Sequence, residues 1–157
     1  MRSITDINEL KKIARELRLD ILEATTRAES GHLSSSFSSV EILTALFFSG
    51  ILRYRSNEPL WPERDRFIMS KGHAAPLLYA VLAKAGYFAR DELWRLRQVG
   101  SPVQGHPILG CMPGVEATTG SLGQGISLAI GHILGGRLNG KDFSPYVLIG
   151  DGVRQAG

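Results

Sequence analysis

The chain has 157 residues, 43% of them hydrophobic and 21% charged, and a formal net charge of +3. These ordinary globular values exclude a disordered chain, and no apolar run approaches the ~20 residues that a membrane helix requires. The small basic excess contains no run of Lys or Arg, so it argues against nucleic acid as a partner and stays compatible with a phosphorylated ligand.

Cysteine usage and the first residues indicate the compartment. Cys111 is the one cysteine, so an internal disulfide is excluded and a structural zinc site is disfavoured, which fits a reducing cytosol. The N-terminal segment is charged and does not resemble a signal peptide. We therefore expect a cytoplasmic protein without a membrane partner.

Two helices are predicted in the N-terminal part of the chain. Apolar residues alternate spacings of three and four over Ile7–Ala28, which places them on one helical stripe, and Asp6 with Glu9 fits a capping pair at its start. A second helix is predicted to begin at Ser38, because Ser38 and Glu41 have the spacing of a capping box.

The middle of the chain combines a strand with further helices. Arg66–Met69 is a short apolar run that predicts a buried strand. Helical patterns follow at about Ala74–Ala85, with Gly86 as the stop, and at about Asp91–Arg97.

The last third begins with an irregular segment, Val99–Leu122, and such long segments in compact domains are usually functional. A helix is predicted over Gly123–Leu138, although it contains several glycines that each cost up to about 1 kcal/mol relative to Ala. Such a cost makes sense if a backbone or a ligand must approach this helix closely. Pro145–Ile149 predicts a final strand. Helices that alternate with buried strands indicate an α/β layered domain with a mainly parallel sheet and flanking helices.

The four histidines lie in different contexts. His32 falls in a small-residue junction between two helices, and His106 falls in the irregular segment. His73 follows the strand Arg66–Met69 where it turns into a helix, at the edge where ligands of open α/β sheets bind. His132 lies inside a regular helix, and we expect it to be structural because nothing else polar surrounds it.

Several common ligand motifs are absent from the sequence. Gly120–Gly125 lacks the dinucleotide spacing and follows a loop rather than a strand, and the P-loop, the serine elbow and the paired-histidine zinc motif do not occur. By contrast, Gly150-Asp151-Gly152 places one carboxylate and two unhindered amides at the end of a strand, where a metal-bound diphosphate could sit.

The order of five motifs along the chain carries more information than any one of them. They are Ser30-Gly31-His32, Asp65–His73, Gly105-His106-Pro107, Pro113–Gly125 and Gly150-Asp151-Gly152. This order resembles the thiamine diphosphate-binding domain of transketolase, and in detail the separate N-terminal subunit of split, two-chain transketolases. Deoxyxylulose-phosphate synthase is a related enzyme with a similar order of elements.

The resemblance implies roles for particular residues. It implies that Asp151 ligates the Mg²⁺ or Ca²⁺ that holds the cofactor's diphosphate, and that the Gly152 amide meets a phosphate oxygen. The site residues it implies are His32, His73 and His106 for catalysis, and His73, Gly120, Leu122, Asp151 and Gly152 for cofactor binding. In this assignment His32 and His106 contact the sugar and His73 faces the diphosphate and the thiazolium ring.

The resemblance also implies an activity and partners. It implies transfer of a two-carbon ketol unit between sugar phosphates by thiamine diphosphate, with a C-terminal subunit that carries the pyrimidine-binding domain, in a homodimer or hetero-oligomer. It further implies a second metal ligand besides Asp151, an Asn beyond Gly157. The family often has an acidic residue at the positions that are Val153–Ala156 in this chain.

We therefore expect residues 1–157 to form a partial diphosphate-binding domain with the thiamine diphosphate-binding fold, truncated after Gly-Asp-Gly and incomplete at the C-terminus, which in isolation is inactive. Two alternatives remain open at this point. One is a fragment that keeps only an assembly surface, and the other is a binding module for a different phosphorylated ligand.

Overall fold

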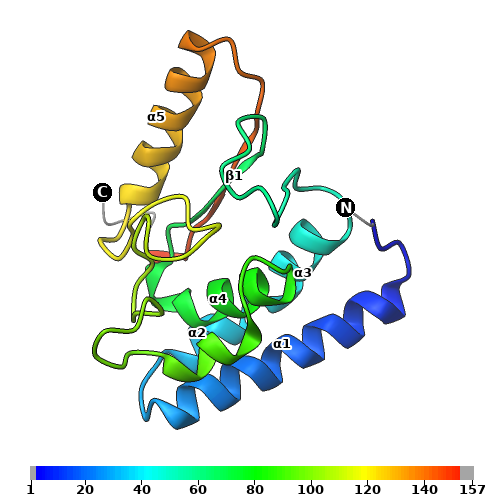
Figure 1. Cartoon of the computed structure of the whole chain (residues 1–157), viewed down its shortest axis with the longest axis vertical. Helices are drawn as coiled ribbons and strands as arrows, with labels where there is room; N and C mark the ends of the chain where they lie inside the picture. The colour runs from blue at the N-terminus through cyan, green and yellow to red at the C-terminus, as the bar shows by residue number, and fades with distance from the viewer. Residues whose placement is uncertain (1–2, 153–157) are drawn as a thin grey trace.

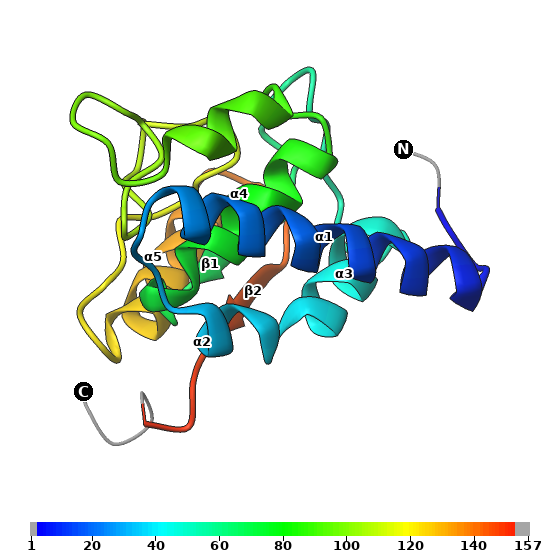
Figure 2. The same ribbon diagram turned by 90° about the horizontal axis from the view of Figure 1, so that it is seen from below.

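The computed structural model describes residues 3–152. A two-stranded parallel sheet lies between a layer of helices and a single helix (Figures 1 and 2). The helical layer contains α1 (Ile7–Arg27), α2 (Leu33–Phe37), α3 (Val40–Phe48) and α4 (Ala75–Lys84), the strands are β1 (Arg66–Met69) and β2 (Pro145–Leu148), and the single helix is α5 (Gln124–Leu138). The chain thus has the predicted α/β architecture with a parallel sheet.

The alternation of side chains along β1 produces these layers. Phe67 and Met69 belong to the large core that the helical layer buries, whereas Ile68 belongs to a small core on the other face, against α5. Since successive residues of a strand point to opposite faces, both faces of β1 are covered, as parallel sheets require. β2 pairs with β1 in parallel register, with Met69 opposite Leu148.

The first helix forms as its periodicity predicts. Leu17 and Ile21 on its apolar stripe are fully buried. Asp6 caps its N-terminus, because its carboxylate accepts a hydrogen bond from the backbone N–H of Asn8 at 2.9 Å. The first N–H groups of a helix have no acceptor within the helix, and this bond satisfies one of them. The helix at Ala75–Lys84 packs against the other helices of the layer, and all of its residues from Ala75 to Leu82 are buried.

The helix predicted to begin at Ser38 forms as α3 from Val40, but its predicted capping by Ser38 is wrong. The segment before it forms the separate short helix α2, and Ser38 closes that helix by donating its backbone N–H to the carbonyl of Ser34. The next helix, α3, begins after Ser39 without a side-chain cap. The hydroxyl of Ser38 instead donates to the carbonyl of Ser35, a local bond that competes with capping.

The segment predicted as a helix at about Asp91–Arg97 forms a 3₁₀ helix, η2, over Arg90–Arg95. It ends because Arg97 takes a left-handed conformation and donates its backbone N–H to the carbonyl of Val103. The irregular character of the following segment up to Leu122 is confirmed.

The glycines of α5 divide into two groups. A Cβ at Gly125 would lie 2.4 Å from the Cβ of Ser70, and a Cβ at Gly136 would lie 2.7 Å from the ring of Phe143. Gly125 confirms the prediction of a close backbone approach, because its Cβ would also lie 2.9 Å from the Cα of Ser70, whereas Gly136 makes room for a side chain. A Cβ at Gly131 would meet open space, so that glycine is not required by packing within the described residues.

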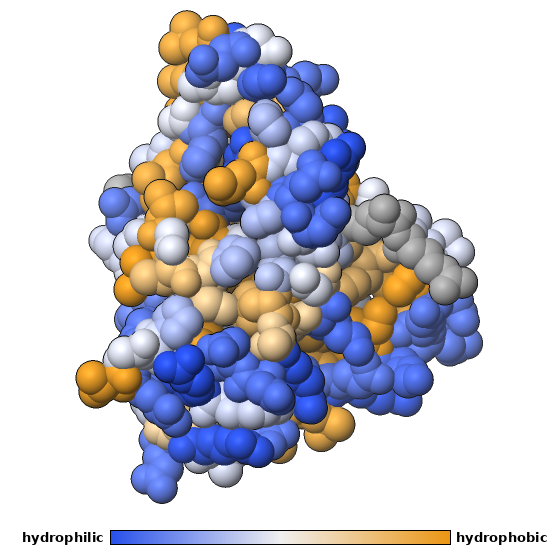
Figure 3. Space-filling view, in the orientation of Figure 1, coloured by the Kyte–Doolittle hydropathy of each residue, from blue (hydrophilic) through white to orange (hydrophobic). Residues whose placement is uncertain are grey.

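The far end of α5 stands apart from the helical layer (Figure 1). Its exposed side carries large apolar residues, and Figure 3 shows hydrophobic side chains on the part of the surface where α5 lies. No helix within residues 3–152 is both long and apolar enough to cross a bilayer. The expected departure from the family at Val153–Ala156 lies outside the described residues.

Candidate functional site

The carboxyl ends of the two parallel strands meet at one edge of the sheet. β1 continues into Ser70-Lys71-Gly72, and the backbone N–H of Lys71 donates to the carbonyl of Leu148 at 3.0 Å. β2 therefore delivers Gly150-Asp151-Gly152 to the edge where β1 delivers His73. Crevices at the carboxyl ends of strands are where open α/β folds bind ligands.

Three histidines that are distant in sequence form a row near this edge. The ring centroids of His32 and His73 lie 4.8 Å apart, and those of His73 and His106 lie 4.9 Å apart, both in edge-to-face arrangements. His73 is thus the central imidazole. The structure brings together the three histidines that the sequence assigned to catalysis and leaves His132 apart from them on α5.

Each imidazole is placed by a different element. His32 immediately precedes α2, and His73 lies in the short 3₁₀ helix η1 (Gly72–Ala74) that joins β1 to α4. His106 lies in the irregular segment, where the hydroxyl of Tyr79 on α4 donates to its backbone carbonyl at 3.1 Å. Three separate parts of the chain therefore converge on one site.

Gly120 packs into the same site. A Cβ at Gly72 would lie 2.8 Å from the backbone nitrogen of Gly120, and a Cβ at Gly120 would lie 3.0 Å from the ring of His106. The hydroxyl of Thr119 holds this segment by donating to the carbonyl of Met69 at 2.7 Å. Bare backbone at Gly72 and Gly120 is therefore required for the loops to meet beside the imidazoles.

The protonation of His106 follows from these neighbours. Burial lowers the pKa of His106, and the nearby His73, Arg97 and His32 lower it further. A neutral imidazole at neutral pH has one donor and one acceptor nitrogen. The His106 ring can therefore both give and accept a proton, which is what general acid–base chemistry on hydroxyl groups requires.

The residues at this edge fit a ligand that carries phosphate oxygens. The hydroxyl oxygen of Ser70 is buried without a hydrogen-bond partner among the described atoms, and it lies against Gly125 in the first turn of α5. Buried polar atoms without a partner are rare in folded proteins, and helix N-termini favour anions. Ser70 therefore leaves one unsatisfied polar group near the N-terminal turn of α5.

The predicted metal ligand is Asp151, in Gly150-Asp151-Gly152. Asp151 and Gly152 are exposed at the end of the described chain. Among residues 3–152 there is no group of three or more His, Cys, Asp or Glu residues that could hold a metal ion. Asp151 therefore offers a single carboxylate, and Leu122, which the sequence assigned to the cofactor, is 43% exposed.

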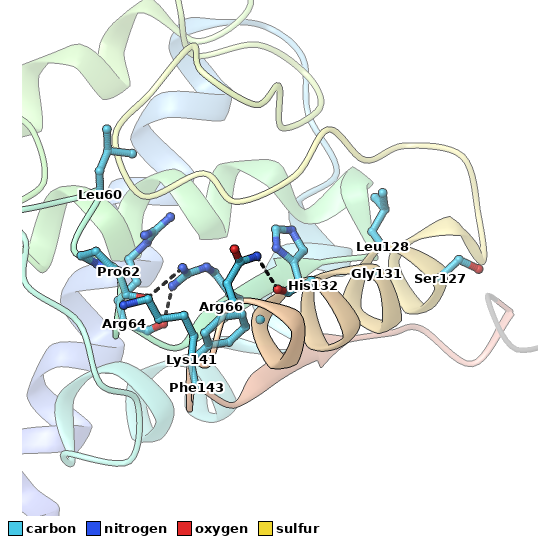
Figure 4. Close-up of a pocket in the computed structure, with 13 residues that line it drawn as sticks. Leu60, Pro62, Arg64, Arg66, Ser127, Leu128, Gly131, His132, Lys141 and Phe143 are labelled. Atoms are coloured by element: carbon cyan, nitrogen blue, oxygen red, sulfur yellow. Dashed lines mark hydrogen bonds between the residues drawn. The ribbon is translucent and has the colours of Figure 1, made fainter.

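A separate hollow of about 710 Å³ lies between α5 and the loops that flank the strands (Figure 4). His132 lines it together with the polar residues Arg64, Arg66, Asn139 and Lys141, so the expectation that nothing polar surrounds His132 is wrong. The arginines already have partners, because Arg64 forms a paired ion contact with Glu116 and the guanidinium of Arg66 stacks on the ring of Phe143. None of His32, His73 and His106 lines this hollow, so it is separate from the imidazole row.

Sequence reasoning assigned no role to Ser70, which packs against Gly125, or to Arg97, which packs against the residue before His106. The guanidinium of Arg97 donates to the hydroxyl of Ser30 at 2.7 Å, 67 residues away in sequence. Ser70 lies inside the motif Asp65–His73, whereas Arg97 belongs to none of the five motifs. The one signal in the sequence was the glycine of Gly105-His106-Pro107, which leaves space for the Arg97 guanidinium.

Residues 9–157 match the family described as transketolase, thiamine diphosphate binding domain. The chain is 45% identical over 147 residues to human transketolase, covering 93% of this chain and 23% of the relative. It is 35% identical over 151 residues to one subunit of the apulose-4-phosphate transketolase of Phocaeicola vulgatus, covering 96% of this chain and 53% of the relative.

Solved structures agree with these relatives. The transketolase of Leishmania mexicana superposes with a TM-score of 0.88 at 37% identity, over 94% of this chain and 24% of that chain. The transketolase of Campylobacter jejuni superposes with a TM-score of 0.90 at 32% identity, over 98% of this chain and 25% of that chain. The chain therefore spans about a quarter of these solved transketolases.

Proposed function

The chain belongs to the family of transketolase thiamine diphosphate-binding domains, and from that premise we propose that it supplies the diphosphate-binding half of a transketolase-type active site. The observation that carries the proposal is the row of His32, His73 and His106 beside the contact between Gly72 and Gly120. A row of imidazoles and bare backbone at the carboxyl edge of a parallel sheet suits a phosphorylated cofactor with a sugar substrate above it.

In this proposal the residues divide by the part of the ligand they hold. Asp151 ligates Mg²⁺ or Ca²⁺ together with groups outside the described residues, and the Gly152 amide donates to a phosphate oxygen. Gly120 and Leu122 contact the cofactor rings. When bound, thiamine diphosphate supplies the carbanion chemistry that moves a two-carbon ketol unit from a ketose to an aldose.

The histidines perform the proton transfers in this assignment. His73, the central imidazole, faces the cofactor, whereas His32 and His106 hydrogen-bond the sugar hydroxyls. The lowered pKa of His106 keeps that ring neutral, so that one nitrogen accepts a hydroxyl proton and the other donates. Sugar phosphates are therefore the proposed substrates.

The site is proposed to be completed by a partner that carries a pyrimidine-binding domain, within a homodimer or a hetero-oligomer. The relative from Phocaeicola vulgatus is by its name one of the subunits of its enzyme, which supports such a two-chain arrangement. The lone Cys111 supports a reducing cytoplasm as the location.

Calorimetric and kinetic measurements test the proposal. The chain alone is expected to bind thiamine diphosphate and Mg²⁺ weakly, because one carboxylate cannot supply the near-octahedral ligand set of Mg²⁺. Addition of a pyrimidine-domain partner is expected to produce ketol transfer between a ketose phosphate and an aldose phosphate. A micromolar dissociation constant for the chain alone would contradict the first expectation, and a complex that binds cofactor without transferring ketol units would contradict the second.

A further inference from the structure

Two residues other than glycine have a left-handed backbone within residues 3–152, Glu29 at φ 47° and Arg97 at φ 60°. This conformation is unfavourable for a residue with a Cβ and persists where surrounding contacts enforce it. Glu29 lies three residues before His32, and Arg97 opens the segment that leads to His106. The two strained positions therefore lie in the segments that lead to the two outer imidazoles of the row.

A side-chain hydrogen bond joins these two segments. Nη1 of Arg97 donates to the hydroxyl oxygen of Ser30 at 2.7 Å. Ser30 directly follows Glu29, so the bond links the strained positions to each other across 67 residues of sequence. A planar guanidinium with several donors in a rigid fork suits such a link better than a flexible ammonium does.

Gly105 provides the space in which the guanidinium lies. A Cβ at Gly105 would lie 2.7 Å from both Nε and Nη2 of Arg97 and 2.9 Å from its Cζ. Real Cβ atoms are not found so close to other heavy atoms, so a side chain at this position would displace the guanidinium. Gly105 immediately precedes His106, and the Arg97 group therefore packs against the backbone that carries this imidazole.

We propose that Arg97 is a positioning residue that holds His106 and His32 on either side of the imidazole between them. The bond to Ser30 ties down the segment before His32, and the contact with Gly105 ties down the segment before His106. His106 lies 4.9 Å from the central ring and His32 lies 4.8 Å from it, centroid to centroid. The use of this geometry in turnover rests on the proposed function.

The charge of Arg97 gives this role a measurable signature. The titratable groups that face His106 are His73, His32 and Arg97, while Tyr79 contacts only its backbone carbonyl. A nearby cation disfavours the imidazolium form, so removal of the Arg97 charge makes His106 easier to protonate. Since this shift follows from the lost charge alone, the positioning role is tested by the ring resonances of His32 and by variants that keep the Arg97 charge.

The decisive experiment follows the histidine ring signals of the ¹⁵N-histidine-labelled full chain by NMR against pH. Arg97→Met is expected to raise the titration midpoint of His106 and to shift the ring resonances of His32, because both segments lose their link. Arg97→Lys, which keeps the charge without the planar fork, is expected to restore the midpoint toward that of the unmodified chain. Thermal unfolding is measured for each variant to verify folding.

Two further variants keep the test decisive if Arg97→Met does not fold. Gly105→Ala keeps the arginine but displaces its guanidinium, and Ser30→Ala removes only the acceptor. Both are expected to shift the ring resonances of His32 and His106. The proposal is overturned if the folded variants Gly105→Ala and Ser30→Ala, which keep the Arg97 charge, leave the ring resonances of His32 and His106 unchanged.

Kinetics then connect the geometry to the reaction. In the complex with a pyrimidine-domain partner, Arg97→Met is expected to lower kcat about 10- to 100-fold, with cofactor affinity and KM nearly unchanged, since misplaced proton-transfer groups slow chemistry more than binding. Unaltered kcat in a variant with displaced imidazoles would overturn the inference about positioning. If the unmodified complex shows no ketol transfer, the proposed function fails, while the NMR result still decides whether Arg97 positions the histidines.

Discussion

The carboxylate of Asp65 accepts hydrogen bonds from both the side chain and the backbone of Arg53. Nε and Nη2 of Arg53 lie 3.1 Å and 2.9 Å from Oδ1 of Asp65, and the backbone nitrogen of Arg53 lies 2.9 Å from Oδ2. The same Oδ1 accepts from the backbone N–H of Ser144 at 2.8 Å. This buried carboxylate therefore joins the loop after α3 to the starts of both strands.

Replacement of Asp65 by Ala is expected to lower the free energy of unfolding by about 2–4 kcal/mol, because several charge-assisted hydrogen bonds are lost and backbone donors are left without an acceptor. Urea denaturation measures this change. Glu58→Ala is the control, since the Arg55–Glu58 pair is about half exposed on both sides, and it is expected to change the free energy by about 0.5 kcal/mol or less. Equal effects of the two substitutions would contradict the assignment.

The same carboxylate predicts an acid sensitivity. Burial alone would raise the pKa of Asp65, but the hydrogen bonds from the Arg53 side chain and from the backbone N–H groups of Ser144 and Arg53 outweigh it and lower the pKa. The unfolded chain therefore takes up this proton first as pH falls, so the stabilisation is complete above about pH 4 and is lost through the lowered folded pKa. The difference in free energy of unfolding between the unmodified chain and Asp65→Asn is therefore expected to become smaller in this acidic range. Denaturant unfolding curves at several pH values measure this difference, and a difference that does not change with pH would contradict the prediction.

Asp151→Ala is expected to abolish cofactor retention in the assembled complex, because the metal loses a charged ligand and the diphosphate loses its neutralising anchor. Calorimetric titration with thiamine diphosphate and Mg²⁺ measures the loss. Asp142→Ala is a matched control, since Asp142 is an exposed carboxylate before the opposite end of β2. Equal retention by the two variants would remove Asp151 from the metal site.

His32→Ala and His106→Ala are expected to leave cofactor binding nearly intact and to lower turnover by about 10²–10⁴-fold, since each loses a proton donor or acceptor placed at the sugar. Steady-state rates and cofactor titrations of the same samples separate the two effects. His132→Ala is the control and is expected to change stability more than turnover. A His132 variant that binds cofactor but is inactive, beside active His32 and His106 variants, would show that the histidine roles are assigned wrongly.

The exposed face of α5 predicts self-association of the isolated chain. Ile126, Ile130, Leu134 and Leu138 recur every four residues and are 41% to 89% exposed, which forms an apolar stripe on one side of the helix. Leu134→Glu is expected to lower the weight-average sedimentation coefficient, whereas Leu19→Glu, at an exposed leucine on α1, is expected to leave it unchanged. A monodisperse, cooperatively folding monomer of the unmodified chain would refute this prediction.

Local sequence patterns predicted most of the secondary structure correctly. The spacing of apolar residues in Ile7–Arg27 and the short apolar runs of β1 and β2 depend only on neighbours along the chain, and these elements are confirmed. The predicted capping by Ser38 was wrong because Ser38 ends the short helix α2, to which its backbone N–H is bonded. Sequence periodicity does not indicate where that short helix ends.

By itself, the sequence determined the family, through five motifs in order, and named the histidines at which to look. Only the tertiary structure placed His32, His73 and His106 in one row and set Arg97 against Ser30 and Gly105. The physical reason is that these contacts join segments tens of residues apart. Their distances depend on the parallel pairing of β1 with β2 and on the packing of the loops that follow, which no spacing within a single segment encodes.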